Sequence, residues 1–246
     1  MADYTAIMNQ LNHSQPFSRA DLQLAMNQIG MNSSDNTVNH LIIKLLQSGQ
    51  IYRTGRNQYS AALSKRIYQF PHSEFTLSVV NEIREAHPYL DFRIFELIQL
   101  NEFVNHQIAH NIVFVSVEGE FGEDVFNTLW ETHQGGVLLK PSIDDLFRYM
   151  TDDMIIIVKL PTESPKGISD FWDTRIEKML VDIAVDKLLN KIVYKGEYPA
   201  IFHDAIQNYN MDKSLMARYA RRRGALDKFR TFLKTDAGLS EEEFSI

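Results

Sequence analysis

The feature that most constrains the fold is a run of three helical apolar patterns followed by a hairpin pattern within the first 61 residues. In residues 4–11, apolar side chains recur three, four and seven positions apart, which predicts one face of a short helix. A second pattern predicts a helix over 19–28, capped by Ser18 and ending just before Gly30. Each helix has one apolar face to bury, so these elements should pack together as one small unit.

A third helix is expected after Ser34, which is a good N-cap residue. Its buried stripe would consist of Val38, Leu41, Ile42 and Leu45. The opposite face carries hydrogen-bonding side chains rather than the Glu/Lys mixture of a merely solvated helix: Asn36, Thr37, Asn39, His40, Lys44 and Gln47. Asparagine can pair with adenine, and lysine or histidine can reach guanine or phosphate, so this face predicts DNA reading.

The segments 51–53 and 58–60 flank a glycine-containing turn and predict a β-hairpin with Arg53, Arg56 and Asn57 at or near its tip. Three helices and a basic hairpin are typical of a winged helix-turn-helix. In that motif the third helix enters the major groove and the hairpin contacts the flanking backbone or minor groove. A winged helix that binds protein, with merely solvated arginines, remains the alternative.

The charge of the chain is unevenly distributed and predicts two domains, 1–66 and 67–246, joined through a linker at 67–73. Residues 1–66 carry six Lys or Arg, three Asp and no Glu, a net charge of +3. The whole chain carries −7, so the remainder carries −10. This asymmetry predicts a module that can approach nucleic acid attached to one that cannot.

A second basic cluster lies late in the chain and is a candidate partner-binding surface. It contains Arg218, Arg221, Arg222 and Arg223. The three consecutive arginines would fan around a helix, so at least one must face solvent or a partner. If the helix ends near Gly224, interaction with the helix dipole is the simpler explanation for them.

The domain after the linker alternates between helical and strand patterns, which predicts a mixed α/β domain and an α+β fold for the whole chain. Strands are expected over 92–98, 112–117, 137–140 and 154–160, and helices over 77–86, 125–131 and 143–150. A long helix over 174–191, followed by two or three helices after Pro199, predicts a helical subdomain over 174–246. Asp182 and Asp186 are expected on the solvated side of that long helix, where two like charges one turn apart would gain from a cationic partner.

Several patterns suggest catalysis but lack a necessary group. The chain has no cysteine, which excludes thiolate catalysis and cysteine-ligated metals. His106 and His110 have the spacing of a zincin helix, but Gln107 stands where that chemistry needs a glutamate. In the strand before Lys159, Ile157 occupies the position where a restriction-type nuclease needs an acidic residue. We therefore expect no catalysis, no metal and no cofactor.

The composition and the start of the chain predict a soluble cytoplasmic protein. The sequence begins without a basic leader, and its longest purely apolar run, 154–158, is far shorter than the roughly 20 residues that span a bilayer.

Three motifs of the second domain resemble the AbiEi antitoxins of bacterial type IV toxin–antitoxin systems. They are Val137 to Ser142 (VLLKPS), Ile156 to Pro161 (IIVKLP) and Glu177 to Asp182 (EKMLVD). The ending Met216 to Arg223 is also similar to the close of such proteins. The resemblance implies a reading helix over Ser34 to Lys44 and a wing over Arg53 to Tyr59.

The resemblance further implies a transcriptional repressor that binds repeats in double-stranded operator DNA before its own operon, as a monomer or weak dimer that binds cooperatively. It would counteract a nucleotidyltransferase-like toxin, and its C-terminal domain would be needed for that antitoxin function. The alternative is a magnesium-dependent nuclease delivered to DNA by the winged helix. Its candidate carboxylates are Asp91, Glu96, Glu118, Asp152 and Asp153.

Overall fold

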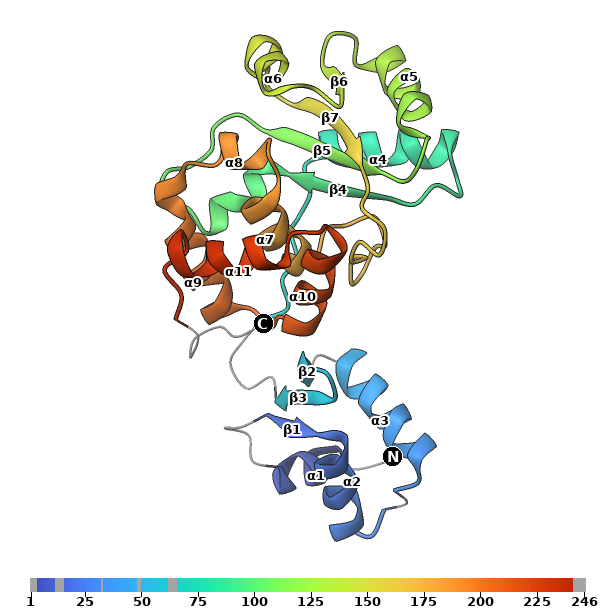
Figure 1. Ribbon diagram of the computed structural model, residues 1–246. Coiled ribbons are helices and arrows are strands. Elements are labelled where there is room, and N and C mark those ends of the chain that lie inside the picture. Colours follow the sequence, from blue (N-terminus) through green and yellow to red (C-terminus); the bar gives the residue numbers. More distant parts are fainter. Residues whose placement is uncertain (1–3, 12–15, 32, 48–49, 62–65, 241–246) are drawn as a thin grey trace. The chain divides into compact units, whose positions relative to one another are not determined.

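A computed structural model describes residues 4–11, 16–31, 33–47, 50–61 and 66–240 (Figure 1). The chain divides into two compact units. Of these described residues, those up to 68 and 206–217 form the N-terminal unit, and 69–205 and 218–240 form the C-terminal unit. Together they form an α+β protein with a helical C-terminal region.

The N-terminal unit contains three helices and a small antiparallel sheet. Its elements are α1 (Tyr4–Gln10), β1 (Phe17–Ser18), α2 (Arg19–Gln28), α3 (Asp35–Gln47), β2 (Ile51–Gly55) and β3 (Gln58–Ala61). The strand order is β1-β3-β2. The three predicted helices and the hairpin are confirmed, while β1 occupies the segment that the sequence indicated only as a break between helices.

Local chemistry accounts for the limits of α2. The Ser18 hydroxyl accepts a hydrogen bond from the backbone N–H of Asp21, and the Asp21 carboxylate accepts one from the backbone N–H of Ser18 at 2.7 Å. This reciprocal pair satisfies two N–H groups that the start of a helix leaves without partners. Gly30, which follows the helix, has a φ of 72°, a conformation that glycine adopts without strain. The predicted cap and terminator are confirmed.

The C-terminal unit is built on a mixed four-stranded sheet in the order β4-β5-β7-β6. Its strands are β4 (Phe92–Glu96), β5 (Ile112–Val117), β6 (Val137–Leu139) and β7 (Met154–Lys159), and its first helices are α4 (Glu74–Ala86), α5 (Gly122–Thr132) and α6 (Ile143–Tyr149). A 3₁₀ helix, η1 (Leu97–Glu102), replaces the end of the predicted first strand. Strand β4 is antiparallel to β5, whereas β5 and β6 are both parallel to β7.

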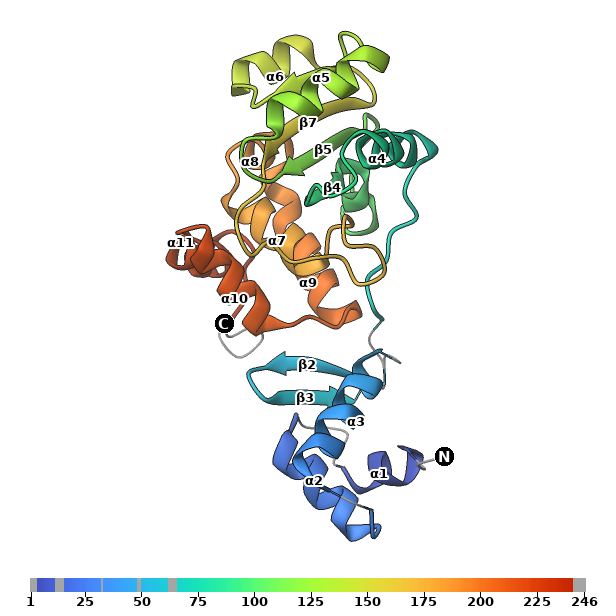
Figure 2. The same ribbon diagram turned by 90° about the vertical axis from the view of Figure 1, so that its right-hand side faces the viewer.

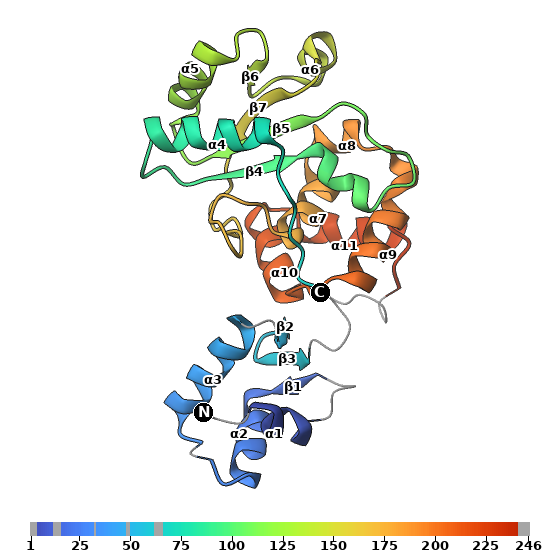
Figure 3. The same ribbon diagram turned by 180° about the vertical axis from the view of Figure 1, so that it is seen from behind.

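Helices cover both faces of this sheet, as the views in Figures 2 and 3 show for α4 and α7 (Ile176–Val185). On one face, α4 and α5 pack against Val113, Val115 and Ile157 to form the main core of the unit. Every residue of β5 is buried. A strand that is buried on both faces reads as a continuous apolar run, and the strands expected over 112–117 and 154–160 are confirmed by β5 and β7.

The prediction of one long helix over 174–191 is wrong, because the helix is interrupted at Asp186. Helix α7 ends at Val185, and a short helix α8 (Leu189–Ile192) follows. The Asp186 carboxylate accepts hydrogen bonds from the backbone N–H groups of Leu188 and Leu189 at 2.9 and 3.3 Å. An aspartate that caps the next turn competes with continuation of the helix. The chain ends with η2 (Lys195–Glu197), α9 (Tyr198–Asn208), α10 (Lys213–Arg222) and α11 (Leu226–Thr235).

The predicted division of the chain also needs correction at two places. Residues 206–217 belong to the N-terminal unit, where Arg66 forms a bridge with Tyr209 through backbone hydrogen bonds to Asn208 and Asn210. The predicted linker over 67–73 is not a solvated connection. Tyr68 is buried, and its ring meets that of Tyr209 edge-on with centroids 5.2 Å apart.

Candidate functional site

The exposed face of α3 is the first candidate site. The predicted core stripe is confirmed, since Val38, Leu41, Ile42 and Leu45 are all buried. On the opposite side, at spacings of three and four, lie Asn36, His40, Ile43 and Gln47, with Asn39 beside them, and all five are exposed. The side chains of Asn36, Asn39 and His40 make no hydrogen bond to another described residue, so their donors and acceptors are available to a ligand.

Ile43 was not among the sequence-predicted site residues, although it lies in the middle of this exposed face. Its side chain is 51% exposed. An exposed isoleucine between polar neighbours is a suitable contact for an apolar group such as the methyl group of thymine. The signal was available in the sequence, because Ile43 is three residues after His40 and four before Gln47, but only hydrogen-bonding side chains were sought on that face.

Ser34 and Thr37 belong to the start of α3. Their hydroxyl oxygens are 2.8 Å apart, and the Ser34 hydroxyl accepts a hydrogen bond from the backbone N–H of Thr37 at 3.4 Å. Near the same helix end, the guanidinium of Arg19 pairs with the Asp35 carboxylate at 2.9 Å and donates to the Asp35 carbonyl at 3.0 Å. The first turn of α3 is thus fixed to α2, and the role of Ser34 is that of the predicted N-cap.

The β2–β3 hairpin carries exposed side chains at Arg53, Arg56 and Asn57. Asn57 has a φ of 55° and its side-chain oxygen accepts a hydrogen bond from the backbone N–H of Arg19 at 3.4 Å, so it shapes the turn and ties it to α2. Among the predicted contact residues, Lys44 on α3 is also exposed. The structure therefore keeps three exposed cations, Lys44, Arg53 and Arg56, on α3 and the hairpin.

The prediction that Tyr59 lies on the contact surface is wrong. Tyr59 is only 5% exposed and packs in the core of the N-terminal unit, where its ring lies 6.2 Å from that of Phe17. Tyr59 follows the inward alternation of β3, so its ring must point to the core. The guanidinium of Arg53 lies over this ring at 5.7 Å, which gives Tyr59 a supporting role for an exposed arginine.

The late basic cluster does not form one surface. Arg218 and Arg221 are exposed, and Arg222 donates to the Thr162 hydroxyl at 2.7 Å and pairs with Glu163 at 3.3 Å. Arg223 is instead engaged inside the C-terminal unit, where it forms ion pairs with Asp182 and with Asp186. The assignment of Arg223 to a partner-binding surface is therefore wrong.

Asp182 is the centre of this buried network, and its predicted place on a solvated helix face is wrong. Its carboxylate accepts hydrogen bonds from the ammonium of Lys178 at 2.6 Å, from the hydroxyl of Tyr219 at 2.9 Å and from Arg223. Burial alone would raise the pKa of Asp182, but Lys178 and Arg223 outweigh that effect and hold it below its ordinary value. The cationic partner expected for Asp182 and Asp186 is Arg223 of the same chain.

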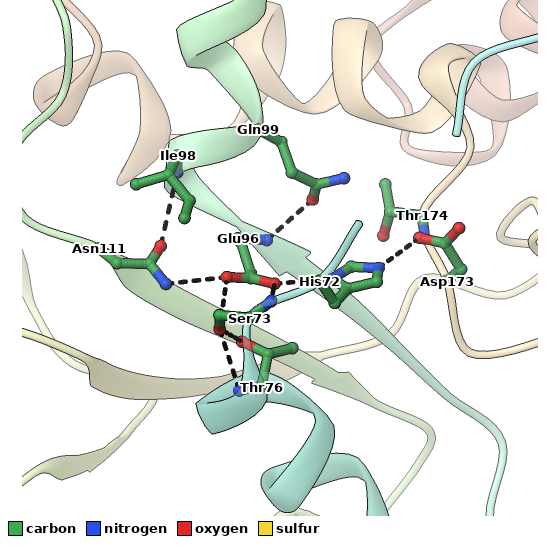
Figure 4. A network of polar contacts seen from close by, with 9 residues as sticks. All are labelled: His72, Ser73, Thr76, Glu96, Ile98, Gln99, Asn111, Asp173 and Thr174. Atoms are coloured by element: carbon green, nitrogen blue, oxygen red, sulfur yellow. Dashed lines mark hydrogen bonds and ion pairs between the residues drawn. The ribbon is translucent and has the colours of Figure 1, made fainter. Parts of the chain in front are cut away.

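A second buried network surrounds His72 (Figure 4), a residue of the predicted linker. Nδ1 of its imidazole is 2.7 Å from the Glu96 carboxylate and Nε2 is 3.0 Å from that of Asp173. Glu96 also accepts from the backbone and the hydroxyl of Ser73 and from the amide of Asn111. Burial alone would lower the pKa of His72, but the bonds to Asp173 and Glu96 raise it to about 9.

The features that suggested catalysis do not converge on a site. The segment that holds His106 and His110 is not helical, so their spacing does not place them on one face. Instead, His106 pairs with Glu197 at 2.5 Å and His110 pairs with Asp152. Among the nuclease carboxylates, Glu96 already takes part in hydrogen bonds with His72, Ser73 and Asn111, and Asp91 pairs with Arg93 at 2.7 Å. In the described part of the chain, no group of three His, Asp or Glu residues is placed to hold a metal ion.

The family of the protein follows from its similarity to known sequences. No helix within the described ranges is both long and apolar enough to cross a membrane. A comparison with curated proteins gave no match. The sequence does match the DUF6577 family, described as a family of unknown function, over residues 37–238. That match spans most of α3, the hairpin and nearly all of the C-terminal unit, and the protein therefore belongs to DUF6577.

Proposed function

We propose that the N-terminal unit is a winged helix-turn-helix that binds double-stranded DNA, with α3 in the major groove and the β2–β3 hairpin against the flanking backbone. The observation that carries this proposal is the exposed face of α3, where Asn36, Asn39 and His40 keep their hydrogen-bonding groups unused among the described residues. A helix that only faces water gains nothing from this choice of residues. A helix that reads base edges gains from it, because such side chains can pair with bases.

The roles of the individual side chains follow from their chemistry. Asn36 and Asn39 can each pair with an adenine, and Ile43 can contact the methyl group of a thymine. Lys44, Arg53 and Arg56 supply positive charge for phosphates on either side of the groove. Because Arg19 is already paired with Asp35, it contributes less to this surface than the net charge of the sequence indicated.

We further propose that this DNA binding represses the operon of the protein and that the protein acts as an antitoxin. This step rests on the resemblance of three C-terminal motifs to AbiEi antitoxins. Among the described residues, Arg218 and Arg221 are exposed arginines of the late cluster whose side chains make no ion pair, whereas the exposed Arg222 is paired with Glu163, so Arg218 and Arg221 are the candidates for contact with a partner. A mobility-shift assay with the DNA upstream of the reading frame, together with rescue of growth from the toxin encoded beside it, tests the two parts separately.

Changing Asn36 and His40 to alanine should test the reading face. Each change is expected to cost about 1–3 kcal/mol of specific binding and to leave nonspecific binding largely intact, because a base-edge contact carries sequence information. Fluorescence anisotropy on operator and scrambled duplexes gives both affinities. Asn81→Ala, an exposed asparagine on α4, is the matched control. An equal loss on both duplexes would show that neither residue reads bases.

Changing Arg56 to alanine should test the wing. Binding is expected to weaken on every sequence, and the slope of log K against log salt should become shallower by about one, since one phosphate contact and its counterion release are lost. The measurement is a titration at four salt concentrations. Arg84→Ala on α4 removes an exposed charge elsewhere and serves as control. A slope that does not change with Arg56→Ala would remove the hairpin from the DNA interface.

A further inference from the structure

The free edge of the sheet in the C-terminal unit carries a surface that the proposed function does not use. Strand β6 is the last strand in the order β4-β5-β7-β6, so it has a neighbouring strand on one side only. Figures 1 and 3 show β6 between α5 and α6, with one helix on either side of the strand. Together, the exposed side chains of residues 121–150 around this strand make up the β6 surface.

Strand β6 also has backbone hydrogen-bonding groups that its own sheet does not use. The carbonyl of Gly136 accepts a hydrogen bond from β7 and the N–H of Lys140 donates one to β7, both at 2.8 Å. Backbone groups alternate in direction along a strand, so the N–H and C=O groups of Val137 and Leu139 point away from β7. In the described part of the chain these groups have no hydrogen-bond partner. Such an edge is a template for a further strand.

The surroundings of β6 are strongly acidic. Residues 118–153 contain nine Asp or Glu and two Lys or Arg. Their net charge of −7 equals that of the whole chain, so the rest of the chain is neutral in sum. The helix dipole favours carboxylates in the first turn of a helix, but Glu131 lies in the last turn of α5, where the dipole is unfavourable to it. Helix stability therefore does not account for all of this charge, and a cationic partner would.

The topology places part of this charge near the carboxyl end of β6. Strands β5 and β6 are both parallel to β7, so α5 and α6, which connect these strands, both begin near the carboxyl end of β6 and end near its amino end. Accordingly, Gly122 at the start of α5 lies against the side chain of Leu139. Glu123 and Asp144 lie in the first turns of the two helices. Both are exposed, and within the described ranges neither side chain forms an ion pair or a hydrogen bond.

Large apolar side chains are exposed near the amino end of β6. Trp130 in the last turn of α5 is 40% exposed, and its ring stacks on that of Phe126 with centroids 5.4 Å apart. At the end of α6, Phe147 and Tyr149 are 53% and 50% exposed. Tryptophan and tyrosine are enriched among the residues that contribute most to binding at protein interfaces. This end of the β6 surface therefore suits apolar side chains of a partner.

We propose that the β6 surface binds an extended, positively charged segment of a partner protein, which adds to the sheet as a fifth strand beside β6. Its backbone pairs with Val137 and Leu139. Its cationic side chains face Glu123 and Asp144, and its apolar side chains lie against Trp130. A second copy of this chain is a poor occupant, because it would bring two strongly acidic surfaces together. The proposal is independent of DNA binding, since all of these residues belong to the C-terminal unit.

The test uses the full-length protein and, as the probe, a short synthetic peptide of alternating lysine and valine. Binding is measured by fluorescence anisotropy of the labelled peptide and by the tryptophan emission of the protein. The chain has two tryptophans, and Trp172 is only 5% exposed, so a strand that covers Trp130 should shift the emission to shorter wavelength. Trp130→Phe should abolish this shift.

Two comparison peptides separate the contributions of charge and of strand pairing. One has glutamate in place of lysine, and the other is the lysine–valine peptide N-methylated at every backbone nitrogen. Each is expected to bind at least about 10-fold more weakly, because the first is repelled by the acidic surface and the second cannot donate hydrogen bonds to the edge of β6.

Variants locate the binding on the protein. Glu123→Gln/Asp144→Asn removes two exposed carboxylates beside β6 and should weaken binding of the lysine–valine peptide about 5-fold or more. Asp170→Asn/Asp227→Asn changes the net charge equally at exposed positions elsewhere in the unit and should change Kd by less than about 2-fold. If Glu123→Gln/Asp144→Asn does not fold, the two comparison peptides decide the test.

Four results would overturn the proposal. They are no binding of the lysine–valine peptide to the unmodified protein, equally tight binding of either comparison peptide, equal Kd values for the two double variants, and an emission shift that persists in Trp130→Phe. An emission shift that grows with protein concentration without peptide would also overturn it, in favour of a second copy of the chain as the occupant. No DNA is present in these assays, so their failure leaves the DNA-binding proposal untouched.

Discussion

Replacing Asp182 with asparagine is expected to lower the free energy of unfolding of the C-terminal unit by about 3–5 kcal/mol, the largest effect of any single change considered. Asparagine keeps the shape of the side chain but removes the charge that Lys178 and Arg223 both face. Two cations would then remain close together, with Lys178 nearly inaccessible to water. Urea unfolding followed by circular dichroism measures the loss.

Two further variants test the cause of this loss. In Asp182→Asn/Lys178→Met one uncompensated cation is removed as well, so the double variant should recover part of the stability lost by the single change. Asp227→Asn alters an aspartate whose side chain is 97% exposed and should change stability by less than about 0.5 kcal/mol. If Asp182→Asn costs no more than Asp227→Asn, the buried network does not stabilise the unit.

The free energy of unfolding should also decrease at alkaline pH because of His72. Its pKa is raised from 6.5 to about 9 in the folded protein, so the folded state holds a proton that the unfolded chain has released. The contribution is complete below pH 6.5 and is lost as the pH rises through 9, and a shift of this size corresponds to about 3 kcal/mol. Unfolding free energies measured between pH 6 and pH 10 should show this decline.

The control for this prediction is His110, whose side chain is 70% exposed and pairs with Asp152 at the surface. Exposed pairs contribute little, so His110→Gln should leave the pH dependence unchanged. In His72→Gln the decline between pH 6.5 and pH 9 should disappear, with lower stability at pH 6. A His72→Gln protein that retains the same decline would show that another group causes it.

Helices and strands were predictable wherever one short segment of the chain contained the whole residue pattern that identifies them. The cap and limits of α2, the stripe Val38 to Leu45 and the strand β5 follow from spacing over fewer than 15 residues, and each is confirmed. The mixed sheet was predictable because its buried strands read as apolar runs. These are local properties, and no knowledge of distant partners is required to recognise them.

The side chains whose surroundings were not predicted depend on residues far away in the sequence. Asp182 is buried because Arg223 lies beside it, 41 residues later, and His72 is buried because Asp173 lies beside it, 101 residues later. A charge in isolation is correctly expected on the surface, since its burial is costly without a partner. The prediction for Tyr59 was wrong for a related reason. A tyrosine suits either an interface or a core, and the face of β3 on which it lies decides between them.

The hydrogen bond from Tyr219 of α10 to Asp182 of α7 also affects how deletion experiments on this protein should be interpreted. A chain shortened after residue 217 would lack Tyr219 and Arg223, and Asp182 would keep Lys178 as its remaining partner. Loss of activity in such a deletion variant would follow equally from destabilisation of the C-terminal unit and from loss of a binding surface. Charge substitutions at the exposed Arg218 and Arg221 distinguish the two effects, because they leave the internal support of α7 in place.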